Sequence, residues 1–316
     1  MEREPMLLCC GLTTLDVVQV VDAVPAPDQK VVAGRLDVRF GGPAANAAAT
    51  AAALGVPTRL VTALGGGPVA ELVRAGLAAA GVEVIDLAEG TAATPPVSTV
   101  LVTRATGERA VVSVNAVGMP DLGAPAARAL DAGVLDGVTA VLVDGHHLAA
   151  GVALATAARR LGVPVVLDGG SWKPGLGDLL AQVDHAVLSA DFVLPDRSAA
   201  PGADGAGPDG VGPDGVGPDG VLAGVLARWP LDSAARSAGS GPLEVRTRAG
   251  DRWTVPVRVV PAGAVVDTLG AGDVLHGGLA AALARGAGID DALREGSRWA
   301  TESVRHAGAL GWAAAR

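Results

Sequence analysis

Residues Asp267-Thr-Leu-Gly-Ala-Gly-Asp273 follow a short apolar run, Ala264–Val266, and lead into an Ala- and Leu-rich stretch that extends to about Arg285. This order predicts a strand, a glycine-rich turn and a helix that begins at Asp273. A turn of this kind forms an anion site, because free backbone N–H groups and the positive end of the helix dipole point to one place. Its two glycines also allow the backbone to approach a phosphate group closely.

The carboxylate at the end of this turn would be out of place in a simple phosphate site, because Asp273 would repel a bound anion. Its position is explained if Asp273 takes a proton from a hydroxyl group while the N–H groups of the turn hold the phosphoryl group under attack. The local sequence therefore predicts the transfer of a phosphoryl group to a hydroxyl acceptor.

The whole chain of 316 residues is long enough for one large α/β domain or two small ones. Hydrophobic residues account for 50% of it, aromatic residues for only 2%, and the net charge is −9. The scarcity of aromatic side chains argues against a base-stacking surface, and the negative charge argues against non-specific binding to nucleic acid or anionic membranes. A small anionic substrate would need a local group of Arg or Lys residues.

The N-terminal segment has too short an apolar run for a secretory signal, and acidic residues precede that run. No stretch reaches the roughly 18 to 20 uninterrupted apolar residues of a membrane span. The two cysteines, Cys9 and Cys10, are adjacent on an expected strand and are interpreted as core residues. We therefore expect a cytoplasmic protein that associates with neither membranes nor nucleic acid.

Apolar runs typical of strands alternate with Ala- and Leu-rich helical patterns along most of the chain, which predicts a mostly parallel sheet covered by helices. Short Gly-Val-Pro turns recur after a helix and before a strand. Strands are expected at Met6–Cys10, Arg59–Ala63, Val138–Val143, Val163–Leu167 and Ala186–Leu188, and helices at Ala44–Leu54, Pro68–Ala80 and Gly151–Leu161.

Three segments depart from this alternation. Residues 13–40 and 97–115 contain strand-like patterns without a helix, which predicts a small separate sheet that acts as a lid over the carboxyl ends of the main strands. Residues 201–221 include three copies of Gly-Pro-Asp-Gly-Val. We interpret them as a flexible surface insertion rather than a Ca²⁺ site, because such widely spaced carboxylates do not form the dense oxygen cage that Ca²⁺ requires.

A second motif, Gly41-Gly-Pro-Ala-Ala-Asn46, stands at the start of the first long helix. A double glycine followed by Asn suits a backbone that passes close to a polyhydroxylated ligand, whose hydroxyl groups the amide can hydrogen-bond. An ordinary turn and helix start would explain the same residues equally well. Asp16, directly after the first strand, also has two interpretations, since its carboxylate can bind two sugar hydroxyls or cap a turn.

Together, Gly41-Gly42…Asn46 and Asp267-Thr268…Asp273 resemble the two signature regions of the ribokinase (PfkB) family of carbohydrate kinases, and the similarity covers nearly the whole chain. The sequences around Asp16 and Asp273 are most similar to the ketohexokinase and sulfofructose kinase branches. The resemblance implies one ribokinase-like domain over residues 1–316, with a three-layer α/β/α core and a small β-sheet lid. It also implies ATP- and Mg²⁺-dependent transfer of the γ-phosphoryl group to a sugar hydroxyl, and a homodimer that forms through the lid.

Roles for individual residues follow from the same resemblance. Asp273 would be the base that deprotonates the acceptor hydroxyl. Lys30 and Asn115 match the anion-binding positions of the sulfofructose kinase branch. The full implied set comprises the N–H groups of Gly270, Ala271 and Gly272 for the γ-phosphoryl group; Asp16, Gly42, Asn46, Lys30 and Asn115 for the substrate; Gly239, Ser240 and Gly241 for ATP; and Asp267, Thr268 and Gly308 for a monovalent cation such as K⁺.

Three positions depart from the family pattern. The Glu that organises Mg²⁺ is expected within residues 188–195, which hold no Glu but do contain Asp191. Mg²⁺ would then be held by Asp191, or by ATP and water alone. The nucleotide loop is preceded by a more polar sequence, Ala234-Ala-Arg-Ser, and His146 stands where the sulfofructose kinase branch has an Arg for a sulfonate.

Two rival functions stay open: a nucleoside kinase of the same family, and a catalytically silent protein that binds a sugar or nucleotide on this fold. Retention of Asp273 with its glycines argues against the silent protein, and the missing Glu argues for it. Several other polar residues also have two interpretations. His276 is expected to pack in the core or lie at the surface rather than act in catalysis, and Arg104 and Arg109 are expected to be solvated rather than bind a substrate phosphate. For Asp168, and for one of His146 and His147, a place facing the crevice and a place away from it are equally compatible with the sequence.

Overall fold

The structure is a computed structural model that describes residues 4–195 and 218–315. Its central sheet has nine strands in the order β13 (Arg252–Val255), β12 (Gly241–Thr247), β11 (Ser233–Ala238), β10 (His185–Leu188), β9 (Val165–Gly169), β8 (Ala140–Val143), β1 (Leu7–Cys10), β4 (Thr58–Thr62) and β5 (Val82–Asp86). The strands pair in parallel from β11 to β5, whereas β12 is antiparallel to both of its neighbours. The loops that follow β1, β8, β9 and β10 therefore lie at one edge of the sheet.

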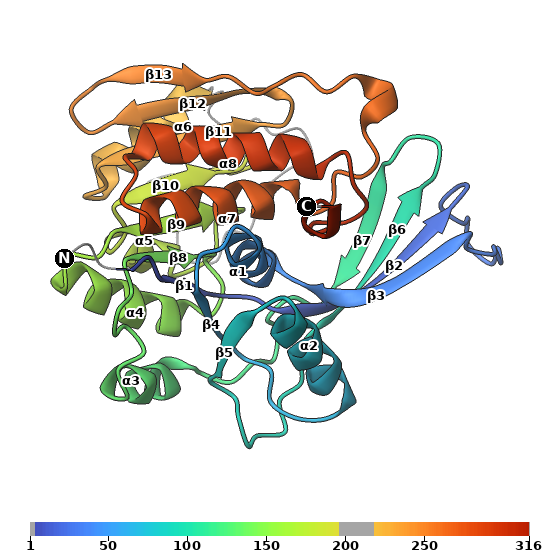
Figure 1. The fold of residues 1–316 in the computed structure, drawn as a ribbon, viewed down its shortest axis with the longest axis horizontal. Coiled ribbons are helices and arrows are strands. Elements are labelled where there is room, and N and C mark those ends of the chain that lie inside the picture. The colour runs from blue at the N-terminus through green and yellow to red at the C-terminus, as the bar shows by residue number, and fades with distance from the viewer. Residues whose placement is uncertain (1–3, 196–217, 316) are drawn as a thin grey trace.

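Helices cover both faces of this sheet, so the core has three layers (Figure 1). One face carries α1 (Pro43–Ala53), α2 (Pro68–Ala79), α7 (Ala271–Ala284) and α8 (Ile289–Ser303), and the other carries α3 (Gly123–Asp131), α4 (Leu148–Arg160), α5 (Leu176–Leu180) and α6 (Pro218–Arg228). Successive side chains of a strand point to opposite faces. Accordingly, Leu7 and Cys9 belong to the core on the first face, and Leu8 and Cys10 to the core on the second.

This architecture confirms the predicted α/β class and the core position of both cysteines, which are free and buried. The predicted strand at Ala264–Val266 is wrong. Ala262–Ala264 form a turn of 3-10 helix, and Val266 is 56% exposed. The N–H group of Val266 donates to the carbonyl oxygen of Val304, directly after α8, at 2.8 Å. A loop tied to the end of α8 therefore leads into the signature turn, because these apolar residues have no neighbouring strand to pair with among the described residues.

A second sheet of four strands is formed by the two helix-free insertions, as predicted, and Figure 1 shows it projecting from the side of the core. Its order is β3 (Arg35–Gly41), β2 (Thr14–Val21), β6 (Val97–Thr103) and β7 (Arg109–Ser113). Val18, Val100 and Val102 form an apolar cluster on one face, against which Leu269 of the signature turn packs. This face is the inner face of the lid, and it contacts the turn directly.

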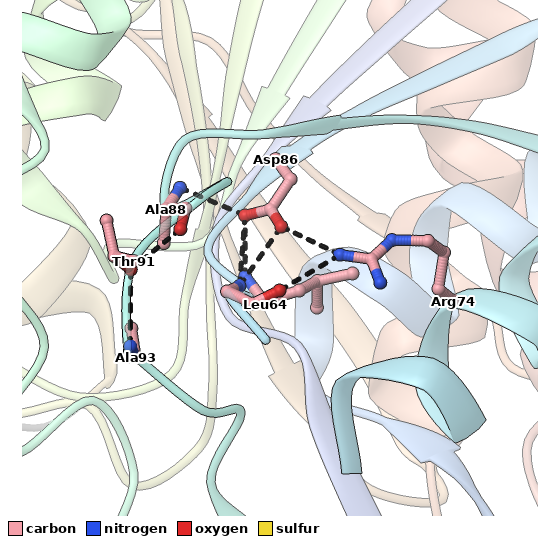
Figure 2. Close-up of polar contacts among 7 residues, drawn as sticks. Leu64, Arg74, Asp86, Ala88, Thr91 and Ala93 are labelled. Carbon is pink, nitrogen blue, oxygen red and sulfur yellow. Dashed lines mark hydrogen bonds and ion pairs between the residues drawn. The ribbon is translucent and has the colours of Figure 1, made fainter. Parts of the chain in front are cut away.

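A buried carboxylate at the end of β5 holds the segment that leads towards β6 (Figure 2). Asp86 accepts hydrogen bonds from the backbone N–H groups of Leu64 at 2.8 Å, Gly65 at 3.0 Å and Ala88 at 2.9 Å. The guanidinium of Arg74 on α2 binds the same carboxylate at 2.9 Å. These contacts join the ends of β4 and β5 to α2 and hold the start of the connection between the core and the lid.

The Gly-Pro-Asp-Gly-Val repeat lies largely outside the described residues. Helix α6 begins at Pro218, so the last four residues of the predicted 201–221 insertion are helical, and residues 201–217 are not described. In the two described ranges, no helix combines the length and the apolar character that a membrane crossing requires.

Candidate active site

A cavity of about 350 Å³ opens beside the signature turn. Its walls come from the lid strands β2 and β3, the start of α1, the signature turn and the loop after α8. Five of the predicted site residues line it: Asp16, Gly42, Asn46, Gly270 and Asp273. The other lining residues are Arg39, Phe40, Leu269, Ala307, Ala309, Leu310 and Gly311. The fold thus brings the two sequence motifs, which lie at opposite ends of the chain, to one place.

Asp273 lies in the first turn of α7, where its Oδ2 accepts a hydrogen bond from the Asn46 amide at 2.7 Å. Burial raises the pKa of the Asp273 carboxyl to about 7, and the negative charge of Asp168 acts in the same direction. The hydrogen bond from Asn46 opposes this rise. Asp273 can therefore gain or lose a proton near neutral pH, as a general base must.

The turn before Asp273 requires glycine at one position. Gly270 precedes α7 with a φ of 75°, in the left-handed region, and a Cβ atom there would lie 2.5 Å from the Cβ of Ala309. The N–H group of Ala271 already donates to the carbonyl oxygen of Thr268 at 3.3 Å. Within the described residues, the N–H groups of Gly270 and Gly272 donate to no backbone carbonyl. These two glycine N–H groups are therefore available to meet an anion.

The double glycine makes room on the opposite wall of the cavity. A Cβ atom at Gly41 would lie 2.0 Å from the Asp16 carboxylate, and one at Gly42 would lie 2.5 Å from the carbonyl oxygen of Leu12. Gly42 also has a φ of 94°. Asp16 Oδ1 accepts a hydrogen bond from the Thr14 hydroxyl at 2.6 Å, which holds the carboxylate in place and leaves Oδ2 to meet a ligand.

Asp144, which the sequence analysis did not single out, joins three elements beneath this wall. It follows β8, and its carboxylate accepts hydrogen bonds from the N–H groups of Leu12 at 2.7 Å, Ala44 at 3.1 Å and His146 at 2.8 Å. Although burial alone would raise the pKa of Asp144, the charge and hydrogen bonds of His146 and the N–H of Leu12 lower it to about 2. In the sequence, the indication of a role at this edge of the sheet was that Asp144 directly follows an apolar strand.

A second buried pair lies on the other side of Asp273. Asp168, at the end of β9, has its Oδ2 at 3.3 Å from Nδ1 of His276 on α7. The same Nδ1 is 2.7 Å from the carbonyl oxygen of Gly272, and Nε2 is 3.2 Å from that of Val187. Burial raises the pKa of Asp168 to about 8 and lowers that of His276. His276 therefore connects the first turn of α7 to the ends of β9 and β10.

Other predicted residues lie outside the lining of the cavity. Lys30, between β2 and β3, and Asn115, after β7, are both exposed. Gly239 and Ser240 form the exposed turn of the hairpin between β11 and β12, and Gly241 begins β12. Because β11 is parallel to β10, this turn stands at the carboxyl edge of the sheet, the edge that also holds Asp144 and Asp168.

The residues predicted for a monovalent cation are close together. Asp267 accepts the N–H groups of Leu269 and Gly308, each at 2.8 Å, and Thr268 follows it in the same turn. Both carboxylate oxygens of Asp267 accept N–H groups, so a monovalent cation here would take its other ligands from backbone carbonyl oxygens. For Mg²⁺, residues 4–195 and 218–315 contain no group of three or more His, Cys, Asp or Glu side chains that could hold a metal. Asp191 is exposed in the turn after β10.

Two arginines of the lid reach the signature region, and the sequence analysis assigned neither to the site. Arg39 on β3 lines the cavity, and its guanidinium packs on the backbone of Gly308. Arg109 on β7, although exposed as expected, donates to the Thr268 hydroxyl at 3.2 Å. For Arg39, the only indication in the sequence was the alternation along β3, which places its side chain on the same face of the strand as that of Arg35.

Comparison with known proteins agrees with this arrangement. A family model described as pfkB family carbohydrate kinase matches residues 4–191 and 250–313. The chain belongs to that family. The pfkB match covers both signature motifs and both parts of the lid, and it leaves out residues 192–249, which contain the predicted ATP loop.

Several solved structures share the fold over almost their whole length. A ribokinase from Giardia lamblia has a TM-score of 0.76 at 19% identity, with 98% of this chain and 96% of that chain covered. A microbiome-derived acarbose kinase has a TM-score of 0.75 at 19% identity, with 96% and 93% covered. A ribokinase from Arabidopsis thaliana, in complex with ribose and ATP, has a TM-score of 0.72 at 19% identity, with 98% and 95% covered. At these identities the likeness establishes the ribokinase-like fold.

Proposed function

We propose that this pfkB family member transfers the γ-phosphoryl group of ATP to a hydroxyl group of a sugar or sugar derivative. The observation that carries the proposal is Asp273, a carboxyl with a pKa of about 7 that stands in the first turn of a helix at the wall of a small cavity. A base next to an anion-binding turn supplies the positioning and the charge stabilisation that phosphoryl transfer requires.

In the proposed reaction, the carboxylate of Asp273 takes the proton of the acceptor hydroxyl as the hydroxyl oxygen attacks the γ-phosphorus. The new O–P bond forms while the bond to the β,γ-bridging oxygen breaks, and ADP leaves with that electron pair. The N–H groups of Gly270 and Gly272, together with the positive end of α7, stabilise the charge on the group in transfer. Ala271 holds the turn through its bond to Thr268.

The sugar would bind between the two motifs. We assign Asp16 to accept hydrogen bonds from two hydroxyl groups and Asn46 to orient the acceptor, because the same amide that donates to Asp273 keeps its carbonyl oxygen for a ligand. Gly42 allows the ligand to approach the backbone. The cavity volume of about 350 Å³ lies at the low end of the range for small-molecule pockets, roughly 300 to 1,000 Å³, which favours a monosaccharide over a nucleoside.

ATP would supply the phosphoryl group, and Mg²⁺ would neutralise the charge of its phosphates. We assign the exposed turn Gly239–Gly241 to the ATP phosphates. Asp191 is the carboxylate that we assign to hydrated Mg²⁺, which usually keeps several waters and needs only one or two carboxylates. A K⁺ ion held by Asp267 and Thr268 beside Gly308 would stiffen the anion-binding turn.

We also propose that two copies associate through the outer face of the lid. There Leu36 and Val38 on β3 and Val112 on β7 are 60%, 50% and 74% exposed. The residues that share this face by their strand register carry no charge, which suits the approach of a second chain with a net charge of −9. Light scattering should give a dimer for the wild type and a monomer for Val38→Glu, with Leu72→Glu on α2 as the control that stays dimeric. A monomeric wild type would refute the dimer.

Substitution of the base tests the proposed reaction. Asp273→Asn keeps the shape of the side chain and its contact with Asn46 but cannot accept the proton, so ADP release should fall about 10²- to 10⁴-fold. Sugar binding, measured by calorimetry, should stay largely intact. Asp290→Asn, an exposed Asp on α8, is the matched control. Unchanged turnover in Asp273→Asn would remove Asp273 from the mechanism.

The acceptor is identified by ADP release from the wild type with a panel of ketoses, aldoses, sugar acids, sugar phosphates and nucleosides. We expect at least one sugar or sugar derivative to stimulate ADP release above the rate with ATP alone, and nucleosides not to. Stimulation by nucleosides alone would replace the sugar with a nucleoside, and no stimulation by any member, with sugar binding retained, would indicate a silent binding protein.

A further inference from the structure

We infer that Arg39 binds an acidic group of the sugar, so that the substrate is an anionic sugar derivative with a carboxylate or phosphate remote from the reacting hydroxyl. This inference rests on the proposed function and narrows its substrate class. Arg39 lines the cavity and is directly opposite Asp16 in the β2–β3 register. Side chains that are opposite one another in an antiparallel pair share a face and lie close together, so both belong to the wall that meets the sugar.

The charge of Arg39 has no protein partner in the described residues. Of the other lid arginines, Arg35 is ion-paired with Asp37 at 2.5 Å and Arg104 with Asp22 at 2.9 Å, and Arg109 donates to the Thr268 hydroxyl. Arg39 takes part in no ion pair with a described carboxylate, even though Asp16 is its cross-strand neighbour. A guanidinium that lines a ligand cavity without a carboxylate partner is suited to an anionic ligand, which it can bind through two parallel hydrogen bonds.

The backbone of the loop after α8 is shaped to receive this guanidinium. A Cβ atom at Gly308 would lie 1.8 Å from Nη1 of Arg39, so any other residue there would displace the guanidinium from this position. Gly308 also has a φ of 70° and is fastened to Asp267 through its N–H group. The next residue, Ala309, packs on Gly270. Arg39 is thus seated at a defined place in the cavity wall, next to the turn that leads to Asp273.

An acidic substrate would need such a cation. The cavity already has two carboxyl groups, Asp16 and Asp273, and Arg39 is the only Lys, Arg or His among the residues that line it. In a chain with a net charge of −9, no general field would attract an anion, so recognition must be local. One small molecule can present a hydroxyl to Asp273 and an oxyanion to Arg39, because both residues line the same cavity of about 350 Å³.

Matched pairs of sugars test the inference with wild type and Arg39→Gln. The pairs are D-gluconate with D-glucose, which tests a carboxylate, and D-fructose 6-phosphate with D-fructose, which tests a phosphate. We expect the wild type to prefer the acidic member of one pair in kcat/KM. Arg39→Gln should lower kcat/KM for that member by about 10- to 100-fold, mainly through KM, and change the neutral member by less than about threefold. Arg35→Gln, on the same strand, is the control that keeps the preference.

Two turnover results would overturn the inference and leave the kinase in place: a wild type that phosphorylates neutral sugars in preference to both acids, or an equal loss for acidic and neutral sugars in Arg39→Gln. If none of the four compounds is phosphorylated, thermal unfolding with each compound decides the point separately from turnover. Stabilisation of the wild type by gluconate or fructose 6-phosphate, absent in Arg39→Gln, would support the inference, and no such difference would refute it.

Discussion

Asp144 is buried and Asp273 is partly buried near the carboxyl edge of the central sheet, and their pKa values move in opposite directions. Burial alone raises the pKa of a carboxyl group. At Asp144 this rise is outweighed by the charge and hydrogen bonds of His146 and by the N–H of Leu12, and the pKa falls to about 2. At Asp273 a single amide donor, Asn46, does not outweigh burial, and the pKa rises to about 7.

The contrast lies in the neighbours of each carboxyl group: a positive charge and several hydrogen-bond donors surround Asp144, whereas Asp273 has a negative neighbour, Asp168, and one donor, Asn46. Asp144 stays charged and fastens the ends of β1 and β8 to the start of α1. Asp273, with one hydrogen-bond donor, is partly protonated near neutral pH. The framework on one side thus holds Asn46, through α1, in position to hydrogen-bond the base on the other side.

The largest expected effect is on stability. The pKa of Asp144 in the fold lies below its ordinary value of about 3.9, so its charge stabilises the fold above that pH and this contribution is lost as pH falls through about 2. The pKa of Asp273 lies above the ordinary value, so its charge destabilises the fold at neutral pH. Asp144→Asn should therefore lower the free energy of unfolding at pH 8 by about 3 kcal/mol, and Asp273→Asn should not lower it.

Urea unfolding of the two variants at pH 8 and pH 4 measures this difference. The loss in Asp144→Asn should persist at pH 4, where most of the Asp144 charge remains. Any gain in Asp273→Asn should vanish there, because the wild-type Asp273 is then protonated. Equal losses in both variants would mean that the two carboxyl groups have the same structural role.

The pH dependence of turnover gives the next largest effect. kcat/KM of the wild type should rise with pH and level off above about 7, because the deprotonated form of Asp273 is the base in the proposed reaction. Asn46→Leu removes the hydrogen bond that lowers this pKa, so the midpoint should move to higher pH by about 1 to 2 units. The midpoint and not the rate is the measurement, since Asn46 also lines the cavity and its replacement would alter substrate binding in the proposed site. A midpoint at the same pH would show that the amide does not tune the base.

Local motifs were the predictable part of the molecule. The turn at 267–273 and the double glycine at 41–42 were recognisable from the spacing of their glycines. The helices after them begin at Ala271 and Pro43, two residues and one residue before the predicted starts at Asp273 and Ala44. The alternation of short strands also predicted the lid. The apolar run Ala264–Val266 was wrongly predicted to be a strand, because apolar content alone does not distinguish a strand from a loop. Here the loop is hydrogen-bonded to Val304, directly after α8.

Contacts between distant segments were out of reach. The hydrogen bonds of Asp144 to Leu12 and Ala44 span 132 and 100 residues, and the seat of Arg39 on Gly308 joins a lid strand to the loop after α8. Strand alternation predicts on which face of the sheet a side chain lies, but not which other segment packs against that face. The predicted ATP loop, Gly239–Gly241, lies within residues 192–249, which the family model does not match.

The smallest expected effect comes from Asp168, whose charge raises the pKa of Asp273. Burial raises the pKa of Asp168 itself to about 8, close to that of Asp273, so the two carboxyl groups titrate over overlapping pH ranges as a coupled pair beside His276 and Asp144, and the charged fraction of Asp168 raises the pKa of Asp273. Asp168→Asn should therefore move the midpoint of kcat/KM to lower pH, by less than Asn46→Leu moves it upward, and should turn a broad rise into a single step. A midpoint that stays in place, or moves up, would mean that Asp168 acts only by holding His276.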